Sequence, residues 1–100
     1  MKNLLSSLLF ASSIYLFNIN AQTQETRTMT FDGNSREYII YVPSSYDGSV
    51  ELPLMFSFHG GGGLSSDFMN YYNDMRPLAD TDGFIAVYPQ ASVDPVDGSY

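Results

Sequence analysis

The chain has 100 residues, with four basic and eleven acidic side chains and no cysteine. This length bounds it to one small domain at most, and its scattered basic residues exclude the clustered phosphate contacts of a nucleic-acid-binding protein. Without cysteine, a disulfide, a cysteine-based zinc site and a lipid-modified cysteine are also excluded within these residues.

Residues 1–21 have the pattern of an export signal. Lys2 gives a short positive start, the run 4–17 is largely apolar, and Ala21 offers a small residue at a cleavage point. Serines interrupt the apolar run, which is shorter than the ~20 residues of a membrane-spanning helix, so no stable membrane anchor is expected. The sequence therefore predicts a signal peptide over 1–21 and a secreted or periplasmic protein.

The chain after the signal is predicted to begin with a hairpin. Residues 22–27 are polar and are expected to be a disordered lead-in. Two β-rich runs, 28–31 and 36–42, are joined by Asp-Gly-Asn-Ser, which is a strong signal for an antiparallel hairpin. Residues 28–100 are interpreted as the N-terminal portion of a domain that is incomplete.

A strand–helix–strand unit follows the hairpin. Residues 52–58 are apolar at nearly every position, which suits a central strand covered on both faces, and residues 84–88 form a second apolar run. A helix is expected to begin near Ser66, to restart at Pro77 and to stop at Gly83. Because such a unit is normally parallel, the prediction is an α/β fold with a mixed sheet.

The loop between the first of these strands and the helix contains four consecutive glycines, Gly60 to Gly63. A phosphate-binding loop would need a lysine that is missing, so nucleotide binding is a weak interpretation. The backbone N–H groups of Gly60, Gly61 and Gly62 could instead stabilise a developing oxyanion, since His-Gly-Gly-Gly after a buried strand has this role in α/β-hydrolase esterases. A flexible turn without function is the third interpretation.

His59 is the only histidine in the sequence. In this fold class the catalytic base lies near the C-terminal end of the domain, so His59 is predicted to orient the glycine loop. Ser65 half-matches a nucleophile elbow, but six residues separate it from Phe58 and Asp67 replaces the final glycine. Capping of the helix by Ser65 or Ser66 is the preferred interpretation.

Two acidic pairs and a group of aromatic residues have simpler structural explanations. Asp80 with Asp82 and Asp94 with Asp97 lack the spacing of a calcium loop and are expected to be solvated turn residues. No metal or organic cofactor is predicted. Three aromatic residues could line a substrate cleft, but a helix face packed on the sheet explains them first: Phe68, Tyr71 and Tyr72.

Taken together, the segments 36–43, 52–60, 78–80 and 83–90 resemble, in order and spacing, the opening of a secreted esterase family. This family includes polyhydroxybutyrate depolymerases and feruloyl or acetylxylan esterases. The resemblance implies an α/β-hydrolase fold and serine-dependent cleavage of polyesters or plant-wall esters. It also implies that the loop after His59 supplies an oxyanion donor.

By the same resemblance, the nucleophilic serine, its aspartate and its histidine should all lie beyond Tyr100. No catalytic side chain is therefore assigned within the chain, which is expected to be inactive by itself.

Two alternative functions stay open. One is an exported binding or structural module in which the glycine loop is a plain turn. The other is a peptidase on the same fold, because the N-terminal portion of this fold does not distinguish enzymes that cleave esters from enzymes that cleave amides.

Overall fold

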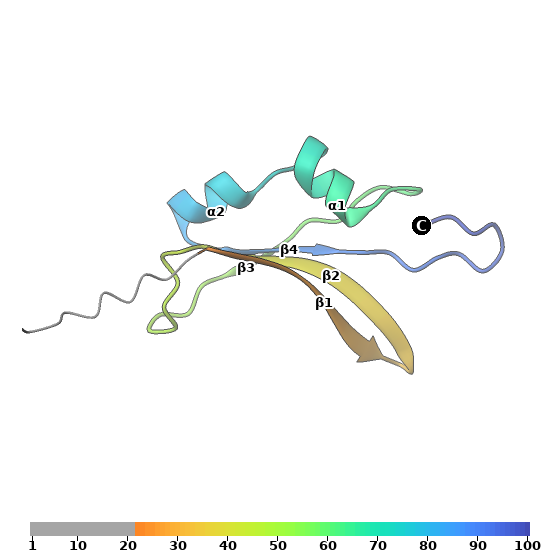
Figure 1. Ribbon diagram of the computed structural model, residues 1–100, viewed down its shortest axis with the longest axis horizontal. Helices are drawn as coiled ribbons and strands as arrows, with labels where there is room; N and C mark the ends of the chain where they lie inside the picture. Colours follow the sequence, from red (N-terminus) through yellow and green to blue (C-terminus); the bar gives the residue numbers. More distant parts are fainter. Residues whose placement is uncertain (1–21) are drawn as a thin grey trace, which may run out of the picture.

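The computed structural model describes residues 22–100, so the predicted signal peptide over 1–21 lies outside the described residues. Four strands form one sheet in the order β1-β2-β4-β3. Helical segments between β3 and β4 lie on one face of this sheet (Figure 1). Among residues 22–100, no helix has the length and apolar character needed to cross a membrane.

The predicted hairpin is confirmed. Strands β1 (Thr23–Phe31) and β2 (Asn34–Val42) pair antiparallel along their whole length. Asp32 and Gly33 both have positive φ, at 49° and 71°, as a tight type I′ turn requires.

The prediction of a disordered lead-in over 22–27 is wrong, because residues 23–27 belong to β1. Their side chains are exposed, and these polar residues pair with β2 through the backbone.

The mixed α/β sheet is confirmed as well. Strand β4 (Ile85–Pro89) pairs parallel with β3 (Leu54–Phe56) and antiparallel with β2. Within residues 22–100, β3 lies at the edge of the sheet and Leu54 is 55% exposed, so no described segment covers this strand on both sides as an interior strand would be covered. The apolar sequence of β3 predicted burial on both faces of the strand, but the described helices cover only one of them.

The connection between β3 and β4 is more broken than predicted. A short α1 (Ser65–Asp67) runs directly into a π-helical turn, η1 (Phe68–Tyr72), and a separate helix α2 (Arg76–Asp82) follows. The predicted restart is confirmed, because Pro77 lies in the first turn of α2. The predicted stop is also confirmed, since Gly83 has a left-handed φ of 74° and its N–H donates to the carbonyl of Ala79.

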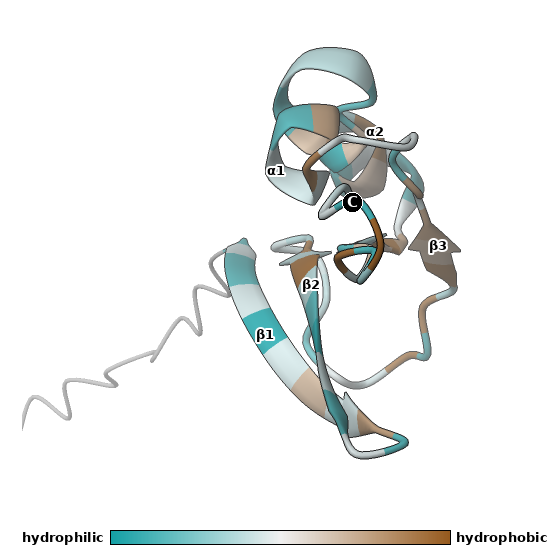
Figure 2. Ribbon diagram, turned by 90° about the vertical axis from the view of Figure 1, so that its right-hand side faces the viewer, coloured by the Kyte–Doolittle hydropathy of each residue, from teal (hydrophilic) through white to brown (hydrophobic). Residues whose placement is uncertain are grey.

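The core lies between the sheet and the helices. Alternate residues of β2 and β4 point to this side and pack against Met69 of η1 and Ala79 of α2. The opposite face of the sheet carries an apolar groove of about 420 Å³, lined in part by Ile40, Leu54 and Phe56. Figure 2 shows the hydrophobic colouring of β3 beside this face. The helices therefore bury one face of the sheet only.

A polar cluster joins the edge of the sheet to α2. The Tyr41 hydroxyl donates to the Asp80 carboxylate, with O–O distances of 2.8 and 2.9 Å, and lies 2.6 Å from the side-chain amide of Gln22. Arg76 adds a second link by donating to the Gln24 side chain at 2.8 Å. Burial, with the hydrogen bond to Asp80 and its negative charge, raises the pKa of Tyr41 to about 12.

This pKa predicts that stability falls in alkaline solution. Between pH 10 and 12 the folded state keeps the Tyr41 proton while the unfolded state has lost it, so the free energy of unfolding decreases as pH rises. The expected loss is on the order of 1 to 2 kcal/mol, because solvent reaches the hydroxyl from an open pocket. Urea denaturation from pH 8 to 11.5 measures it. Tyr41→Phe should flatten this decline, whereas exposed Tyr71→Phe should not; equal slopes in both variants would contradict the assignment.

Candidate functional site

The four-glycine loop forms one wall of a cavity. Gly60 to Gly63 connect β3 to α1, and the cavity beside them has a volume of about 540 Å³. Its lining combines the loop with residues of the helical connection: His59, Gly60, Gly61, Gly62, Gly63, Leu64, Asp67, Phe68 and Tyr72. The loop thus faces a concave surface with both apolar and polar groups.

The backbone amides of this loop differ in their partners. The N–H of Gly62 donates to the Tyr100 carbonyl at 2.5 Å, and the N–H of Gly63 donates to the Gly60 carbonyl at 3.2 Å. The N–H groups of Gly60 and Gly61 meet no acceptor within the described part of the chain. Two of the three predicted donors are therefore free, and the third already binds a carbonyl oxygen.

Two positions of the loop favour glycine for different reasons. Gly62 has a φ of +74°, a left-handed conformation that strains other residues. A Cβ at Gly63 would lie 3.2 Å from the Gly60 oxygen and 3.4 Å from Nδ1 of His59, so the ring approaches the backbone closely. At Gly60 and Gly61 a Cβ would meet no atom within 4 Å, and both positions open to free space.

The structure places His59 against the loop that it is predicted to orient. The ring is partly buried, with Nδ1 at 2.7 Å from the Gly60 carbonyl oxygen. On the other side of the ring, the backbone N–H of Ala91 donates to Nε2 at 3.0 Å. His59 therefore bridges the end of β4 and the first peptide of the loop. Its role in orienting the loop stays a prediction.

Gln90 is a residue of this site that the sequence interpretation did not assign. Its Oε1 accepts the backbone N–H of Ser65 at 2.7 Å, and so satisfies a free donor at the start of α1. Capping by Ser65 or Ser66 is wrong, because Leu64 is the N-cap residue and no side-chain cap bond forms there. The sequence did contain a feature that could have placed Gln90 at this site. The strands on either side of the helical connection were predicted to be parallel, and parallel strands end at the same edge of a sheet, so the residue after β4 lies beside the loop after β3.

The other candidate residues fall into separate places. Asp94 and Asp97 accept backbone N–H groups from their own turns, which confirms them as turn residues. Asp80 and Asp82 lie in α2, so the turn interpretation is wrong for them, and Asp80 accepts a hydrogen bond from Tyr41 away from the loop. Within residues 22–100, no group of three or more acidic or histidine side chains is placed to hold a metal ion.

The aromatic residues of the helical connection divide into two groups. Phe68 packs partly against the core, as predicted for a helix face on the sheet. Tyr71 and Tyr72 are 78% and 80% exposed, so this explanation is wrong for them. Phe68 and Tyr72 stack with ring centroids 6.4 Å apart, and both line the cavity beside the glycine loop. They form an aromatic wall of the cavity that the glycine loop also lines.

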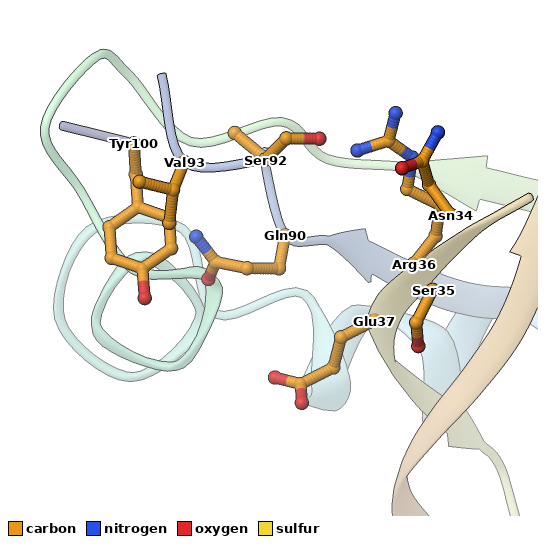
Figure 3. Close-up of a pocket in the computed structure, with 9 residues that line it drawn as sticks. Asn34, Ser35, Arg36, Glu37, Gln90, Ser92, Val93 and Tyr100 are labelled. Atoms are coloured by element: carbon orange, nitrogen blue, oxygen red, sulfur yellow. The ribbon is translucent and has the colours of Figure 1, made fainter. Parts of the chain in front are cut away.

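A second, more polar hollow adjoins Gln90. It has a volume of about 380 Å³, and residues of β2 and of the segment after β4 line it (Figure 3). In this view the Gln90 amide points toward Tyr100 and away from Arg36. Gln90 thus lines this hollow, and its side chain also reaches Ser65 at the start of α1 and the Gly63 carbonyl of the glycine loop.

No model of a protein family matches the chain, and no curated protein sequence does either. Similar chains were found among solved structures. One is a crystal structure of a serine-to-alanine mutant of the esterase rPPE complexed with (S)-Ac-CPA. It has a TM-score of 0.55 and 27% identity, over 85% of this chain and 26% of that one. A double mutant of the same esterase gives a TM-score of 0.53 and 29% identity, over 81% and 25% of the respective chains.

The chain therefore spans about a quarter of the length of these esterase structures. Its hairpin and its parallel strand pair match the N-terminal part of an esterase α/β fold. This similarity supports a hydrolase or esterase function at a coarse level.

Proposed function

We propose that the protein is a secreted carboxylic-ester hydrolase that uses a serine nucleophile, and that the described residues supply its oxyanion loop. The observation that carries the proposal is that Gly60 and Gly61, whose N–H groups meet no acceptor among the described residues, line a cavity with an aromatic wall. Likeness to the esterase rPPE supports the same assignment. The predicted signal peptide over 1–21 is the basis for proposing a secreted or periplasmic location.

In the proposed reaction, the serine oxygen attacks the ester carbonyl as its proton passes to the histidine of the triad, and the carbonyl oxygen becomes negative in a tetrahedral intermediate. The protonated histidine is the catalytic acid of the next step. The loop amides would donate hydrogen bonds to that oxygen. The alcohol then leaves with a proton from the catalytic acid, and water hydrolyses the acyl-enzyme. Each oxyanion donor of this kind contributes roughly 3 to 4 kcal/mol of transition-state stabilisation.

The substrates we propose are polyesters or plant-wall esters, as the family resemblance implies. Phe68 and Tyr72 offer a flat apolar surface next to the loop, which suits an aromatic or hydroxyalkanoyl acyl group. The serine, aspartate and histidine of the proposed triad lie beyond Tyr100, and the reaction needs no metal or organic cofactor.

The full-length protein is expected to hydrolyse p-nitrophenyl acetate and to react covalently with a fluorophosphonate probe. Peptide mapping should locate the label on the serine of a G-x-S-x-G sequence beyond Tyr100. Replacing that serine by alanine should abolish both hydrolysis and labelling, since the nucleophile is then absent. Thermal unfolding measurements on the variant serve as the control for folding.

Parallel assays separate the remaining alternatives. Polyhydroxybutyrate film and methyl ferulate distinguish the two substrate classes, and a p-nitroanilide distinguishes a peptidase. Cleavage of the anilide at a rate above the ester rate would favour a peptidase. A protein that neither cleaves an ester nor takes the label would overturn the proposal, and would favour an exported binding module.

A further inference from the structure

We propose that Gln90 is a positioning residue that, acting through the His59 ring, fixes the direction of the Gly61 amide. This inference rests on the proposed function of that amide as an oxyanion donor. Gln90 directly follows β4, and its own backbone N–H donates to the Glu37 carbonyl of β2 at 2.9 Å. Its side chain therefore extends from a point that the sheet holds in place (Figure 3).

The orientation of the Gln90 amide is set by a backbone group. The N–H of Ser65 can only donate, so the Gln90 oxygen must face it, at 2.7 Å. The amide nitrogen then faces the other way, at 3.1 Å from Nε2 of His59 and 3.4 Å from the Gly63 carbonyl. One side chain thus joins the start of α1, the ring and the end of the glycine loop.

The tautomer of His59 follows from the same reasoning. Nε2 accepts the Ala91 N–H at 3.0 Å and faces the Gln90 amide nitrogen, so it carries no proton. In the neutral ring the proton must lie on Nδ1, where it donates to the Gly60 carbonyl oxygen at 2.7 Å. A proton on Nε2 would instead face two donors and no acceptor, so the contacts favour the Nδ1–H tautomer.

The ring reaches the Gly61 amide through one planar unit. The Gly60 carbonyl and the Gly61 N–H belong to the same trans peptide bond and point in opposite directions. The Gly60 oxygen is held by the His59 ring and by the Gly63 N–H. Holding this oxygen fixes the direction of the Gly61 N–H, which meets no acceptor among the described residues.

The tautomer is tested first, by ¹⁵N NMR of the histidine ring nitrogens in the full-length protein. His59→Asn identifies the signals of this ring by their loss. At a pH where the ring is neutral, we expect a protonated Nδ1 and a bare Nε2. A protonated Nε2 would overturn the proposal. This measurement needs no turnover, so it stands even if the protein proves not to be an esterase.

Two substitutions then separate positioning from simple capping. Gln90→Met removes all three contacts. Gln90→Glu keeps an acceptor for the Ser65 N–H but has no proton for Nε2 of a neutral ring or for the Gly63 carbonyl. At the pH where the NMR shows a neutral ring, both variants should lower kcat for p-nitrophenyl acetate about ten-fold or more, with KM within about two-fold. The Gly61 amide signal should also shift in both.

The outcomes distinguish the possible failures. Full activity in Gln90→Glu together with loss in Gln90→Met would show that Gln90 only caps α1, and would overturn the proposal. Unchanged kcat and an unchanged Gly61 signal in both variants would overturn it as well. Gln24→Met and Gln24→Glu make the same chemical changes on β1, where Gln24 binds Arg76, and should leave kcat unchanged. If the unmodified protein cleaves no ester, the proposed function fails while the NMR measurements still decide the geometry.

Discussion

Replacing Gly61 by valine in the full-length protein is expected to lower kcat/KM for p-nitrophenyl acetate by at least about 100-fold. The new side chain would project into open space at the loop and block access to the free amides of Gly60 and Gly61. Losing one oxyanion donor by itself lowers kcat by roughly 100- to 1,000-fold. Steady-state kinetics with each purified variant measure the effect.

The fold should survive this change. A Cβ at Gly61 meets no atom within 4 Å, and the residue is not in the left-handed region of φ, so neither a clash at Cβ nor backbone strain is expected. The melting temperature should therefore stay within a few degrees of the unmodified protein. Ser92→Val places a similar side chain on an exposed loop residue that does not line the cavity, and should leave activity intact. Undiminished turnover in Gly61→Val would rule out an oxyanion role for this loop.

Tyr88→Phe is expected to lower the free energy of unfolding by about 2 to 3 kcal/mol. Tyr88 is fully buried, and its hydroxyl accepts the Met75 N–H at 2.8 Å and donates to the Asn73 carbonyl at 2.9 Å. Removing the hydroxyl leaves two backbone groups without partners, each at a cost of about 1 to 3 kcal/mol where water is excluded. Urea denaturation at neutral pH measures the change.

A matched variant separates this effect from a general effect of losing a hydroxyl. Tyr72→Phe makes the same chemical change on a side chain that is 80% exposed, and should alter stability by less than about 0.5 kcal/mol. Equal stability of the two variants would mean that water replaces the Tyr88 hydroxyl. The burial that raises the pKa of Tyr88 argues against this replacement.

Local chemistry explains why the hairpin and the end of α2 were predictable. Asp32 and Gly33 fit a tight turn, and Gly83 takes a left-handed conformation, whatever the rest of the chain does. The place of β3 was not predictable, because an apolar run indicates burial without naming the neighbour that provides it. Sheet order depends on distant segments, and among residues 22–100 it leaves β3 at an edge.

The π-helical turn and the capping of α1 were not predicted, because they too depend on residues that are distant in sequence. Asn73 closes the wide turn by donating its N–H to the Phe68 carbonyl, and its side chain also binds Ser57, which lies before the glycine loop. Gln90 caps a helix that begins 25 residues earlier in the chain. The glycine loop itself was found because its motif is continuous in sequence, whereas its supports come from separate elements.

The early start of β1 bears on how an exported chain would mature. Pairing with β2 begins at Thr23, close behind the proposed cut after Ala21. Peptidases act on extended, accessible backbone, and a strand already docked in a sheet does not offer it. Removal of a leader at this point would therefore have to come before the first strand docks, so that processing precedes folding rather than trimming a finished product.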